Sequence, residues 1–464
     1  MSGPADRPNL TTTPIPGLLV VGLDLRGDSR GSFKETWQRA KMTALGLPDF
    51  APVQHNVSFN GRRGVTRGIH AEPWDKFVSV ASGRAFGAWV DLREGPSFGT
   101  TYTHELGPDT AVFVPRGVGN AYQVLEDATA YSYLVNRHWR PDAGYIELNL
   151  ADPTVAIAWP IPVDDPSVEL SEKDRANPAL ADVRPMGPAP ILLLGGSGQL
   201  GTALRQAFPG IEAPGRDVLD LADPASVAGF DFSSYDVVVN AAAFTGVDAA
   251  EGEGRADAWA TTATGPALLA ARAGTENFTL VHFSSDYVFD GTRDEHAEDE
   301  PLAPLGVYGQ SKAAGDLAVS ASPRHYLVRT TWVVGEGRNF VRTMQRLARD
   351  GVRPTVVDDQ VGRLTFADEL ARATRHLLEI GAPYGTYNVT NGGDAQSWAG
   401  FAAAVFHAMG RPRDDVRPVS TEEYGAGKSL APRPMRSTMS LEKLRATGFE
   451  PTDVLDALAG YVAD

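Results

Sequence analysis

The segment ILLLGGSGQLG, residues 191–201, decides the fold of the C-terminal half of this chain. Its apolar start predicts a buried strand, and Gly195, Gly198 and Gly201 follow directly, before a helical pattern. Glycine permits a tight turn and lets backbone N–H groups approach a pyrophosphate, whose charge the helix N-terminus then faces. The Gly-x-x-Gly-x-x-Gly spacing differs from that of most dehydrogenases. Its position between strand and helix nevertheless predicts a dinucleotide site.

Strand-like and helix-like segments alternate from this turn onward, which predicts a doubly wound parallel sheet of the Rossmann type with a smaller substrate-binding part. The expected strands are residues 191–195, 236–244, 279–285, 325–333 and 354–358. The expected helices include residues 199–208, 256–274 and 311–321.

The ribose end of the dinucleotide site has two candidate partners. Asp220 lies about 20 residues past the turn, where an acidic group favours NAD. Arg216 lies close by and would instead meet the 2′-phosphate of NADP. The sequence therefore leaves NADH and NADPH open as the hydride donor.

Two further segments suggest carbonyl chemistry. YGQSK, Tyr308 to Lys312, places a phenol and an ammonium on one helix face, where the ammonium favours the phenolate and readies it for proton exchange. SSDYVFDG follows a predicted strand, and ligands of doubly wound folds bind at such strand ends. Ser285 is the candidate partner of a substrate carbonyl, with Ser284 as the second choice.

The N-terminal half has a different pattern, because short β-like runs between residues 76 and 135 are separated by Gly and Pro. Such a pattern predicts a sandwich or barrel. The stretch NPALADVRPMGPAP is rich in Pro and small residues and has no periodicity, which indicates a linker. We therefore expect domains at 1–180 and 190–464, joined by a linker at 181–189.

His70 is the candidate catalytic residue of the N-terminal half. Arg62, Arg63 and Arg67 precede it and Lys76 follows, a cationic cluster suited to a pyrophosphate and a developing enolate. The other histidines of this half are not spaced as a metal-binding set, so we expect no catalytic metal there.

Composition limits the remaining possibilities. The 464 residues suit two or more domains, and the absence of Cys excludes disulfides, thiolate zinc sites and a cysteine nucleophile. The net charge of −16 disfavours binding to nucleic acid or anionic membranes. No apolar run is long enough to span a bilayer, and we see no signal peptide. We therefore expect a cytoplasmic protein.

The C-terminal motifs resemble those of dTDP-4-dehydrorhamnose reductases, of the extended short-chain dehydrogenase superfamily. GGSGQLG, NAAAFTGVDAAE, SSDYVFDG, YGQSK and RTTWVVG occur in the family's order, and APRPMRSTMSLEKL resembles its closing Arg-Pro segment. The resemblance implies Tyr308 as proton donor, Lys312 as its activator, Ser285 as the catalytic hydroxyl and Trp332 in the substrate pocket.

GRLT, residues 362–365, departs from the usual Gly-x-Pro-Thr. Some family members use Mg²⁺, for which no ligands are assigned. The expected cofactor contacts are Gly195, Ser197, Gly198, Gln199, Leu200, Gly201, Asp220, Leu221, Asn240, Ala241, Ala242, Tyr308 and Lys312.

The N-terminal motifs resemble those of dTDP-4-dehydrorhamnose 3,5-epimerases, which have a cupin-like jelly roll. DSRGSFKETW, QHNVSF, RGVTRGIH, FVPRGVGNAY and LSEKD follow the family's order. The resemblance implies His70 as general base, Asp174 as its carboxylate partner and Tyr133 as catalytic acid. Asn120 stands where the family has His, and His138 and Trp139 replace a Tyr pair. The implied substrate contacts are Arg30, Glu35, Gln54, Asn56, Arg67, Lys76 and Asn120, with Ser284 and Trp332 in the other half.

Together the halves predict a bifunctional enzyme that epimerises dTDP-4-dehydro-6-deoxy-D-glucose at C3 and C5 and reduces C4 with NADPH or NADH, giving dTDP-L-rhamnose. The resemblance also implies a homodimer formed through the jelly roll. Alternatives remain open: another nucleotide, single epimerisation, a talose-type product, or a silent jelly roll beside an active reductase.

Overall fold

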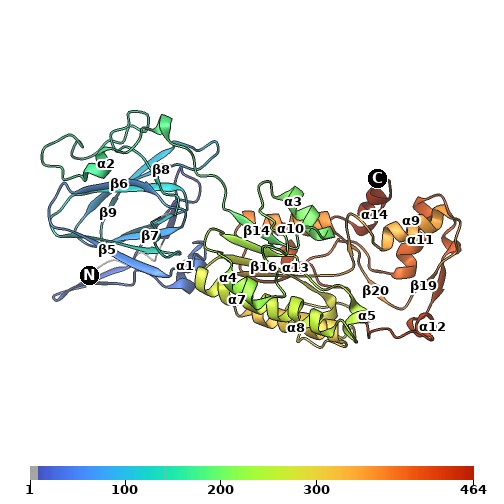
Figure 1. Ribbon diagram of the computed structural model, residues 1–464. Helices are drawn as coiled ribbons and strands as arrows, with labels where there is room; N and C mark the ends of the chain where they lie inside the picture. Colours follow the sequence, from blue (N-terminus) through green and yellow to red (C-terminus); the bar gives the residue numbers. More distant parts are fainter. Residues whose placement is uncertain (1–8, 142, 464) are drawn as a thin grey trace. The chain divides into compact units, whose positions relative to one another are not determined.

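The computed structural model describes residues 9–141 and 143–463 and divides into two compact units, Met1–Pro188 and Ala189–Asp464 (Figure 1). Each unit has its own hydrophobic core. No helix within the described residues is long and apolar enough to cross a membrane.

The N-terminal unit is a sandwich of two antiparallel sheets (Figure 1). Apolar side chains from both sheets, among them Val78, Trp89, Val112 and Tyr131, pack together as its core, and the jelly-roll prediction is confirmed. The six-stranded sheet has the order β1 (Asn9–Thr12), β2 (Leu19–Gly22), β10 (Thr110–Val114), β7 (Lys76–Ser82), β12 (Thr129–Val135) and β5 (Gln54–Asn60). The five-stranded sheet has the order β13 (Ile146–Glu147), β6 (Thr66–Ala71), β11 (Val118–Val124), β8 (Ala85–Asp91) and β9 (Thr101–Leu106).

Three smaller elements complete this unit. A hairpin of β3 (Leu25–Asp28) and β4 (Gly31–Lys34) pairs with neither sheet. Helix α1 spans Arg39–Leu45, and the short helix α2 spans Glu172–Arg175.

Residues 181–189, the expected linker, lie largely within the N-terminal unit, which extends to Pro188. Leu180, Val183 and Met186 are buried. The Met186 N–H donates to the Leu92 carbonyl at 2.8 Å, and Arg116 donates to the Gly187 carbonyl at 2.8 Å. The apolar side chains spaced among the prolines provide this packing. The segment that packs on neither unit is therefore shorter than residues 181–189.

The C-terminal unit is built on a five-stranded parallel sheet in the order β14 (Ile191–Leu194), β15 (Val237–Asn240), β16 (Thr279–Ser285), β17 (His325–Thr330) and β22 (Gly385–Asn388). On the other side of β14, Leu192 forms a parallel bridge with Glu212. The segment that follows β14 therefore lies on one side of this strand, and β15, which comes later in the chain, lies on the other side. Such a reversal opens a crevice at the carboxyl ends of the strands.

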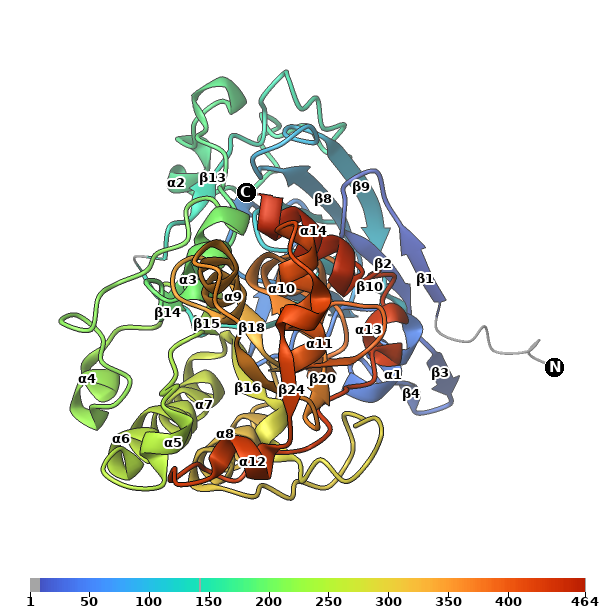
Figure 2. The same cartoon turned by 90° about the vertical axis from the view of Figure 1, so that its right-hand side faces the viewer.

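Helices cover both faces of this sheet, which confirms the Rossmann-type prediction (Figures 1 and 2). Alternate strand residues point to opposite faces, so Leu193 and Val239 pack with one helix set while Leu192 and Val238 pack with the other. The first set is α3 (Gln199–Ala207) and α10 (Ala367–Glu379); the second is α4 (Pro224–Gly229), α7 (Gly265–Glu276) and α8 (Val307–Ser320).

One expected strand lies elsewhere. Residues 354–358 contribute β19 (Thr355–Val357), which pairs with β24 (Arg417–Val419) outside the main sheet. The fifth strand of the main sheet is β22, whose sequence GTYN is too short and polar to be recognised as a buried strand.

A second lobe with its own core follows the sheet. It includes β19 and β24 with the helices α9 (Phe340–Arg349), α11 (Trp398–Ala408) and α14 (Val454–Ala463), which lie toward the viewer in Figure 2. Two short strand pairs complete it, β18 (Val333–Val334) with β21 (Thr365–Phe366) and β20 (Val361–Gly362) with β23 (Gln396–Ser397).

Candidate active sites

The turn after β14 requires its glycines. Gly195 has a φ of +80°, and a Cβ there would lie 2.6 Å from the backbone of Ala241 and Ala242. A Cβ on Gly201 would lie 2.2 Å from the Gly195 carbonyl oxygen. Gly198 is the N-cap of α3. The first turn of the helix therefore packs directly on the strand ends, with backbone exposed toward the crevice.

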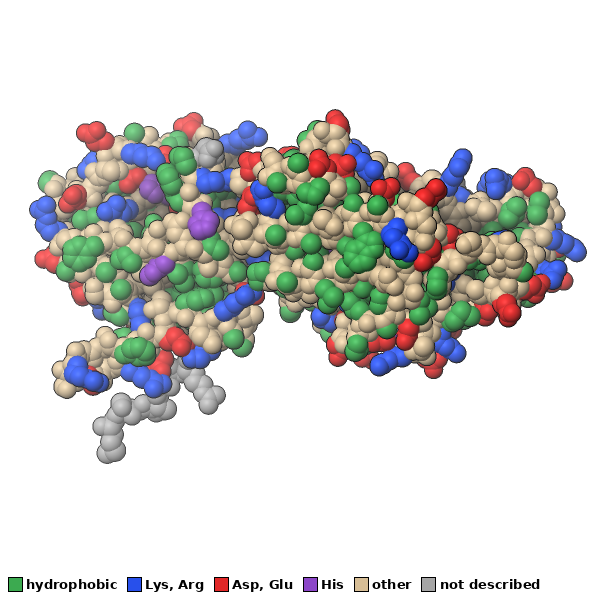
Figure 3. Space-filling view, turned by 60° about the horizontal axis from the view of Figure 1, so that its bottom comes forward, with side chains coloured by type: hydrophobic (Ala, Val, Ile, Leu, Met, Phe, Trp, Pro, Cys, Tyr) green, Lys and Arg blue, Asp and Glu red, His purple; other side chains and the backbone are tan. Residues whose placement is uncertain are grey.

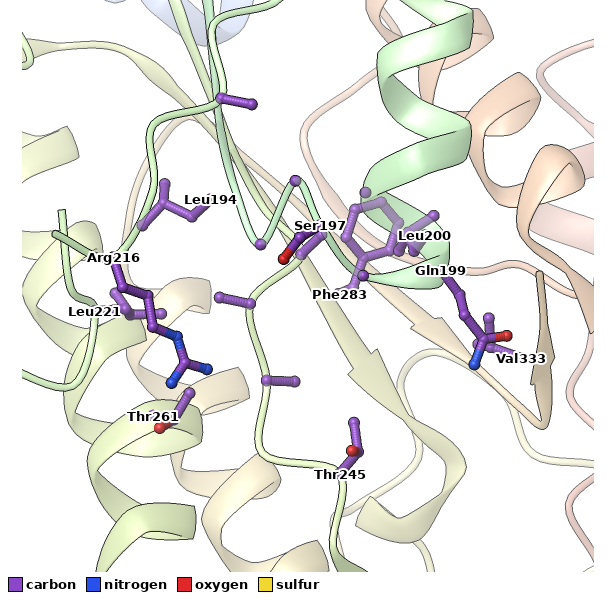
Figure 4. A pocket seen from close by; sticks show the side chains of 18 of the residues that line it. Leu194, Ser197, Gln199, Leu200, Arg216, Leu221, Thr245, Thr261, Phe283 and Val333 are labelled. Atoms are coloured by element: carbon purple, nitrogen blue, oxygen red, sulfur yellow. The ribbon is translucent and has the colours of Figure 1, made fainter. Parts of the chain in front are cut away.

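A cavity of about 680 Å³ extends from this turn to the start of α8 (Figure 4). A single continuous space thus joins the glycine turn to the expected Tyr-Lys pair. Of the predicted residues, it is lined by Gly195, Ser197, Gly198, Gln199, Leu200, Gly201, Arg216, Asp220, Leu221, Ala241, Ala242, Ser284, Tyr308 and Lys312.

Tyr308 and Lys312 lie one helical turn apart at the N-terminal end of α8. Burial raises the pKa of Tyr308, and a hydrogen bond with Ser285 opposes that rise. Burial also lowers the pKa of Lys312 to about 8, against the opposing effect of the Asp316 carboxylate. The Lys312 Nζ donates to the Phe283 carbonyl at 3.2 Å. The Tyr308 phenol, which burial makes a weaker acid, thus lies one helical turn from the buried Lys312 amine. The pKa of about 8 means that this amine gains and loses its proton close to neutral pH.

Ser285 ends β16 and does not line the large cavity, whereas Ser284 does. The Ser285 Oγ donates to the Asp286 Oδ1 at 2.9 Å and accepts the Tyr287 N–H at 3.3 Å. Its side chain lowers the pKa of Tyr308 against the effect of burial, so Ser285 lies near the phenol although it does not line the cavity.

Two predicted residues lie beside the large cavity without lining it. The Asn240 side chain is fully buried, bonds to His282 at 3.0 Å and accepts the Ala242 N–H at 3.1 Å, so it shapes the strand end. Trp332 stacks on Trp398 with ring centroids 3.9 Å apart, in the second lobe. A Cβ on Gly362, in the divergent GRLT loop, would lie 3.2 Å from the Trp332 ring.

Charged side chains of both signs also line the cavity, Arg216 and Asp220 among them. The Arg216 guanidinium reaches into the space beside Leu221 and Thr261 (Figure 4). Arg205, which the sequence analysis did not single out, also lines it. The Asp220 carboxylate accepts the Ala222 N–H at 2.9 Å, so one of its oxygens is already used in a local turn.

The N-terminal unit has a smaller cavity of about 200 Å³ between its strands. It brings together six predicted residues from both sheets and from α2: Arg67, His70, Lys76, Asn120, Tyr133 and Asp174. Glu72, Ser58, Tyr122 and Tyr131 also line it.

The partly exposed His70 pairs with the buried Asp174 across 104 residues of sequence. The His70 Nε2 lies 2.8 Å from the Asp174 Oδ1, and Asp174 is only 5% exposed. The Ser171 hydroxyl accepts the Asp174 N–H and so caps α2 at this point. The carboxylate holds the imidazole ring through Nε2, so Nδ1 lies outside this hydrogen bond.

Lys76 and Tyr133 complete this site. Lys76 is 6% exposed, forms an ion pair with Glu72, and lies with its Nζ 5.7 Å from the centre of the Tyr133 ring. Burial, reinforced by Glu72, raises the pKa of Tyr133, so its hydroxyl stays protonated at neutral pH. Glu72 was not predicted, because it lies between two strands, where its spacing from Lys76 carries no sequence signal.

Several predicted contacts lie outside this cavity. Arg30 pairs with Asp28 in the exposed hairpin, and Glu35 pairs with Lys41 at 2.7 Å. Gln54 donates to Asn56 at 3.0 Å on β5. The expected arginine cluster around His70 is also wrong in part: only Arg67 lines the cavity, because Arg62 and Arg63 lie in the exposed turn before β6.

Metal ligands are not apparent in either site. Among residues 9–141 and 143–463, no three His, Asp or Glu side chains are arranged to hold a metal ion. No ligand for Mg²⁺ is therefore assigned.

Fold and sites together define the class: a Rossmann-type short-chain reductase unit joined to a cupin-like jelly roll with a His-Asp-Tyr site. Residues 189–464 match the family described as RmlD substrate binding domain, and residues 12–182 match the family dTDP-4-dehydrorhamnose 3,5-epimerase. The chain belongs to the RmlD substrate binding domain family and carries an epimerase-family domain fused before it.

Relatives of each part are known. The "Protein RmlC homolog" of Streptococcus pyogenes serotype M6 is 47% identical over 181 residues, covering 38% of this chain and 90% of that protein. The dTDP-4-dehydrorhamnose reductase of Mycobacterium tuberculosis H37Rv is 38% identical over 277 residues, covering 56% of this chain and 88% of that protein. The solved structure of the dTDP-4-dehydrorhamnose reductase of Bacillus anthracis, in complex with NADP, matches with a TM-score of 0.55 and 31% identity. The match covers 59% of this chain and 98% of that one.

Proposed function

We propose that this chain converts dTDP-4-dehydro-6-deoxy-D-glucose into dTDP-L-rhamnose, by epimerisation at C3 and C5 in the jelly roll and reduction at C4 in the Rossmann-type unit. The observation that carries the proposal is the continuous cavity from the glycine turn to Tyr308 and Lys312, together with the enclosed His70 site. Incubating the protein with the 4-keto sugar, with and without NADPH, and identifying products by NMR tests it. Epimers without NADPH and rhamnose with NADPH are expected.

In the jelly roll, the roles follow from carbon acidity. The C4 ketone acidifies the C–H bonds at C3 and C5, and His70, held by Asp174, removes a proton. Lys76 stabilises the enolate charge, since it is the buried cation of the cavity. Tyr133 returns a proton to the opposite face of the sugar.

In the second unit, the turn at residues 195–201 with Ala241 and Ala242 would hold the dinucleotide, because these backbone groups line the cavity at the N-terminus of α3. When bound, the nicotinamide supplies hydride to C4. Tyr308 donates its proton to the developing C4 alkoxide. Lys312 favours the resulting phenolate electrostatically, and Ser285 holds the Tyr308 hydroxyl.

NADPH is the proposed hydride donor. Arg216 reaches into the cavity, whereas one oxygen of the Asp220 carboxylate is already hydrogen-bonded in its own turn. Replacing Arg216 by Gln is expected to raise KM for NADPH about 10- to 100-fold, the effect of losing a hydrogen bond to a charged group. KM for NADH in the same variant should change less than about twofold and serves as the internal control. Equal changes for both donors would contradict a 2′-phosphate contact.

A homodimer through the jelly roll is also proposed. Strand β5 is an edge strand, and its outward residues Val57 and Phe59 are 60% and 66% exposed, with Phe33 of the hairpin at 72%. An exposed apolar edge of this kind is a pairing surface. On the face shown in Figure 3, hydrophobic side chains lie among acidic and basic ones.

The dimer proposal predicts that Phe59→Asp shifts the molar mass in light scattering from two chains to one at micromolar concentration. Leu317→Asp is the matched control, because Leu317 is 67% exposed on α8 of the other unit. A mass of one chain for the unmodified protein would contradict the proposal.

A further inference from the structure

Helix α8 carries a second buried ionisable group one turn beyond Lys312. Asp316 lies four residues further along, so the two side chains share one face of the helix, and they are 2% and 1% exposed. The Lys312 Nζ donates to the Phe283 carbonyl of β16 at 3.2 Å. The Arg329 Nε of β17 donates to the Asp316 Oδ2 at 2.9 Å. An amine and a carboxylate are thus held on the same buried face of α8, each by its own contact with the sheet.

Arg329 keeps the Asp316 carboxylate in place and charged. Its guanidinium also donates from Nη1 to the Glu298 carbonyl at 3.0 Å and lies 5.2 Å from the centre of the Phe289 ring, so three contacts fix its position. Burial raises the pKa of Asp316, and the positive charge of Arg329 opposes that rise. Because arginine stays protonated throughout the working range of pH, it favours the carboxylate over the neutral acid.

The Asp316 charge acts on Lys312 across this helical turn. Burial lowers the pKa of Lys312 to about 8, and the Asp316 carboxylate opposes that fall. The charge of Lys312 likewise opposes the rise in the pKa of Asp316, which is the mutual effect expected of opposite charges. Without the carboxylate, the amine would therefore lose its proton at a lower pH.

The other ionisable groups around Lys312 do not replace Asp316. His282 of β16 is fully buried, and burial together with the Lys312 charge lowers its pKa well below the ordinary value, so it is neutral. Tyr308 is a neutral phenol, since burial raises its pKa. The charged groups of the other elements packed on α8 have their own partners or are exposed: Asp286 accepts the hydroxyls of Ser285 and Ser437, Asp248 pairs with Arg433, Glu251 accepts the Val307 N–H, Arg272 pairs with Glu276, and Arg255 and Asp257 are exposed.

We propose that Asp316 is a positioning residue of the reductase site, whose carboxylate, held by Arg329, keeps Lys312 in the ammonium form that supports Tyr308. The inference rests on the proposed reductase function. A buried lysine without this carboxylate would be largely neutral at the pH at which the phenolate has to form, and the phenolate would then lack a counter-charge. The ion pair of Asp316 and Arg329 thus does more than join the helix to the sheet.

The pH dependence of kcat/KM for NADPH-dependent reduction tests the inference, because this ratio reports ionisations of the free enzyme. In the unmodified protein the ratio should fall on the alkaline side near pH 8, as Lys312 loses its proton. In Asp316→Asn this fall should move to lower pH by about one unit, the effect of losing a nearby opposite charge. Asp316→Glu keeps the charge and should leave the fall in its original place. A fall that does not move in Asp316→Asn, or that moves to higher pH, would overturn the inference.

A second variant covers loss of folding, because Asp316→Asn leaves the buried Arg329 charge without its partner. Asp316→Asn combined with Arg329→Met removes both charges. Its fall should also lie at lower pH, since Asp316 is the member of the pair that acts on Lys312; a fall in the original place would again overturn the inference.

Asp368→Asn is the matched control, because it removes an exposed carboxylate from α10 of the same unit. The pH profile of this variant should equal that of the unmodified protein. Absence of NADPH-dependent reduction in the unmodified protein would instead defeat the proposed function.

Discussion

Tyr308→Phe is expected to lower kcat for reduction of the 4-keto sugar by about 10²–10⁴-fold, the usual contribution of a positioned general acid. The substitution removes the phenol proton proposed for the C4 alkoxide, while the ring keeps its edge-to-face contact with Tyr287 at 5.4 Å. NADPH binding should therefore change little. Stopped-flow absorbance at the NADPH band measures the hydride step, and NADPH fluorescence measures binding.

The matched control for this prediction is Tyr424→Phe, in which a half-exposed tyrosine of the same unit loses its hydroxyl. Its kcat should equal that of the unmodified protein. A Tyr308→Phe enzyme with more than about a tenth of normal kcat would assign proton donation to another group or to water.

His70→Asn is expected to abolish exchange of solvent deuterium into C3 and C5 of the sugar, slowing it about 10²–10⁴-fold. The amide cannot take up a proton, and it is too short to keep the bond that His70 Nε2 makes with Asp174 at 2.8 Å. Reduction of sugar that has already been epimerised should continue, because the large cavity lies wholly within the C-terminal unit. Deuterium content by mass spectrometry and NMR distinguishes the two carbons.

His55→Asn provides the control, since His55 bonds to Ser132 at 2.7 Å and does not line the cavity. Unaltered exchange in His70→Asn, or none in the unmodified protein, would support a silent jelly roll beside an active reductase. Exchange at a single carbon would point to single epimerisation. Asn120 is the residue to examine in that case, because it pairs with His70 across the strands and accepts the Tyr131 hydroxyl at 3.0 Å.

Several residues of the reductase site could be predicted from the sequence, because the patterns that mark them are short. The glycines of 195–201 are required by contacts within one strand–turn–helix unit, and Tyr308 and Lys312 share a face through helical spacing alone. The alternation of strand-like and helix-like segments likewise predicted the Rossmann-type sheet, whereas the short β-like runs predicted a sandwich or barrel and the family resemblance implied the jelly roll. Strand β22 escaped recognition because GTYN has no apolar run, and its place in the sheet comes from pairing with β17.

Contacts between distant segments required the tertiary structure. The contact of Asp286 with Ser437 and the packing of residues 180–187 on the jelly roll are long-range, and so is the pair of His70 and Asp174, which only the family resemblance implied. No spacing rule links such residues, since the chain between them can close in many ways until the sheets pair. Sequence by itself therefore determined which chemical groups and which folds are present. Tertiary structure alone decided which of those groups share a cavity, and which, like Arg62 and Arg63, remain in solvent.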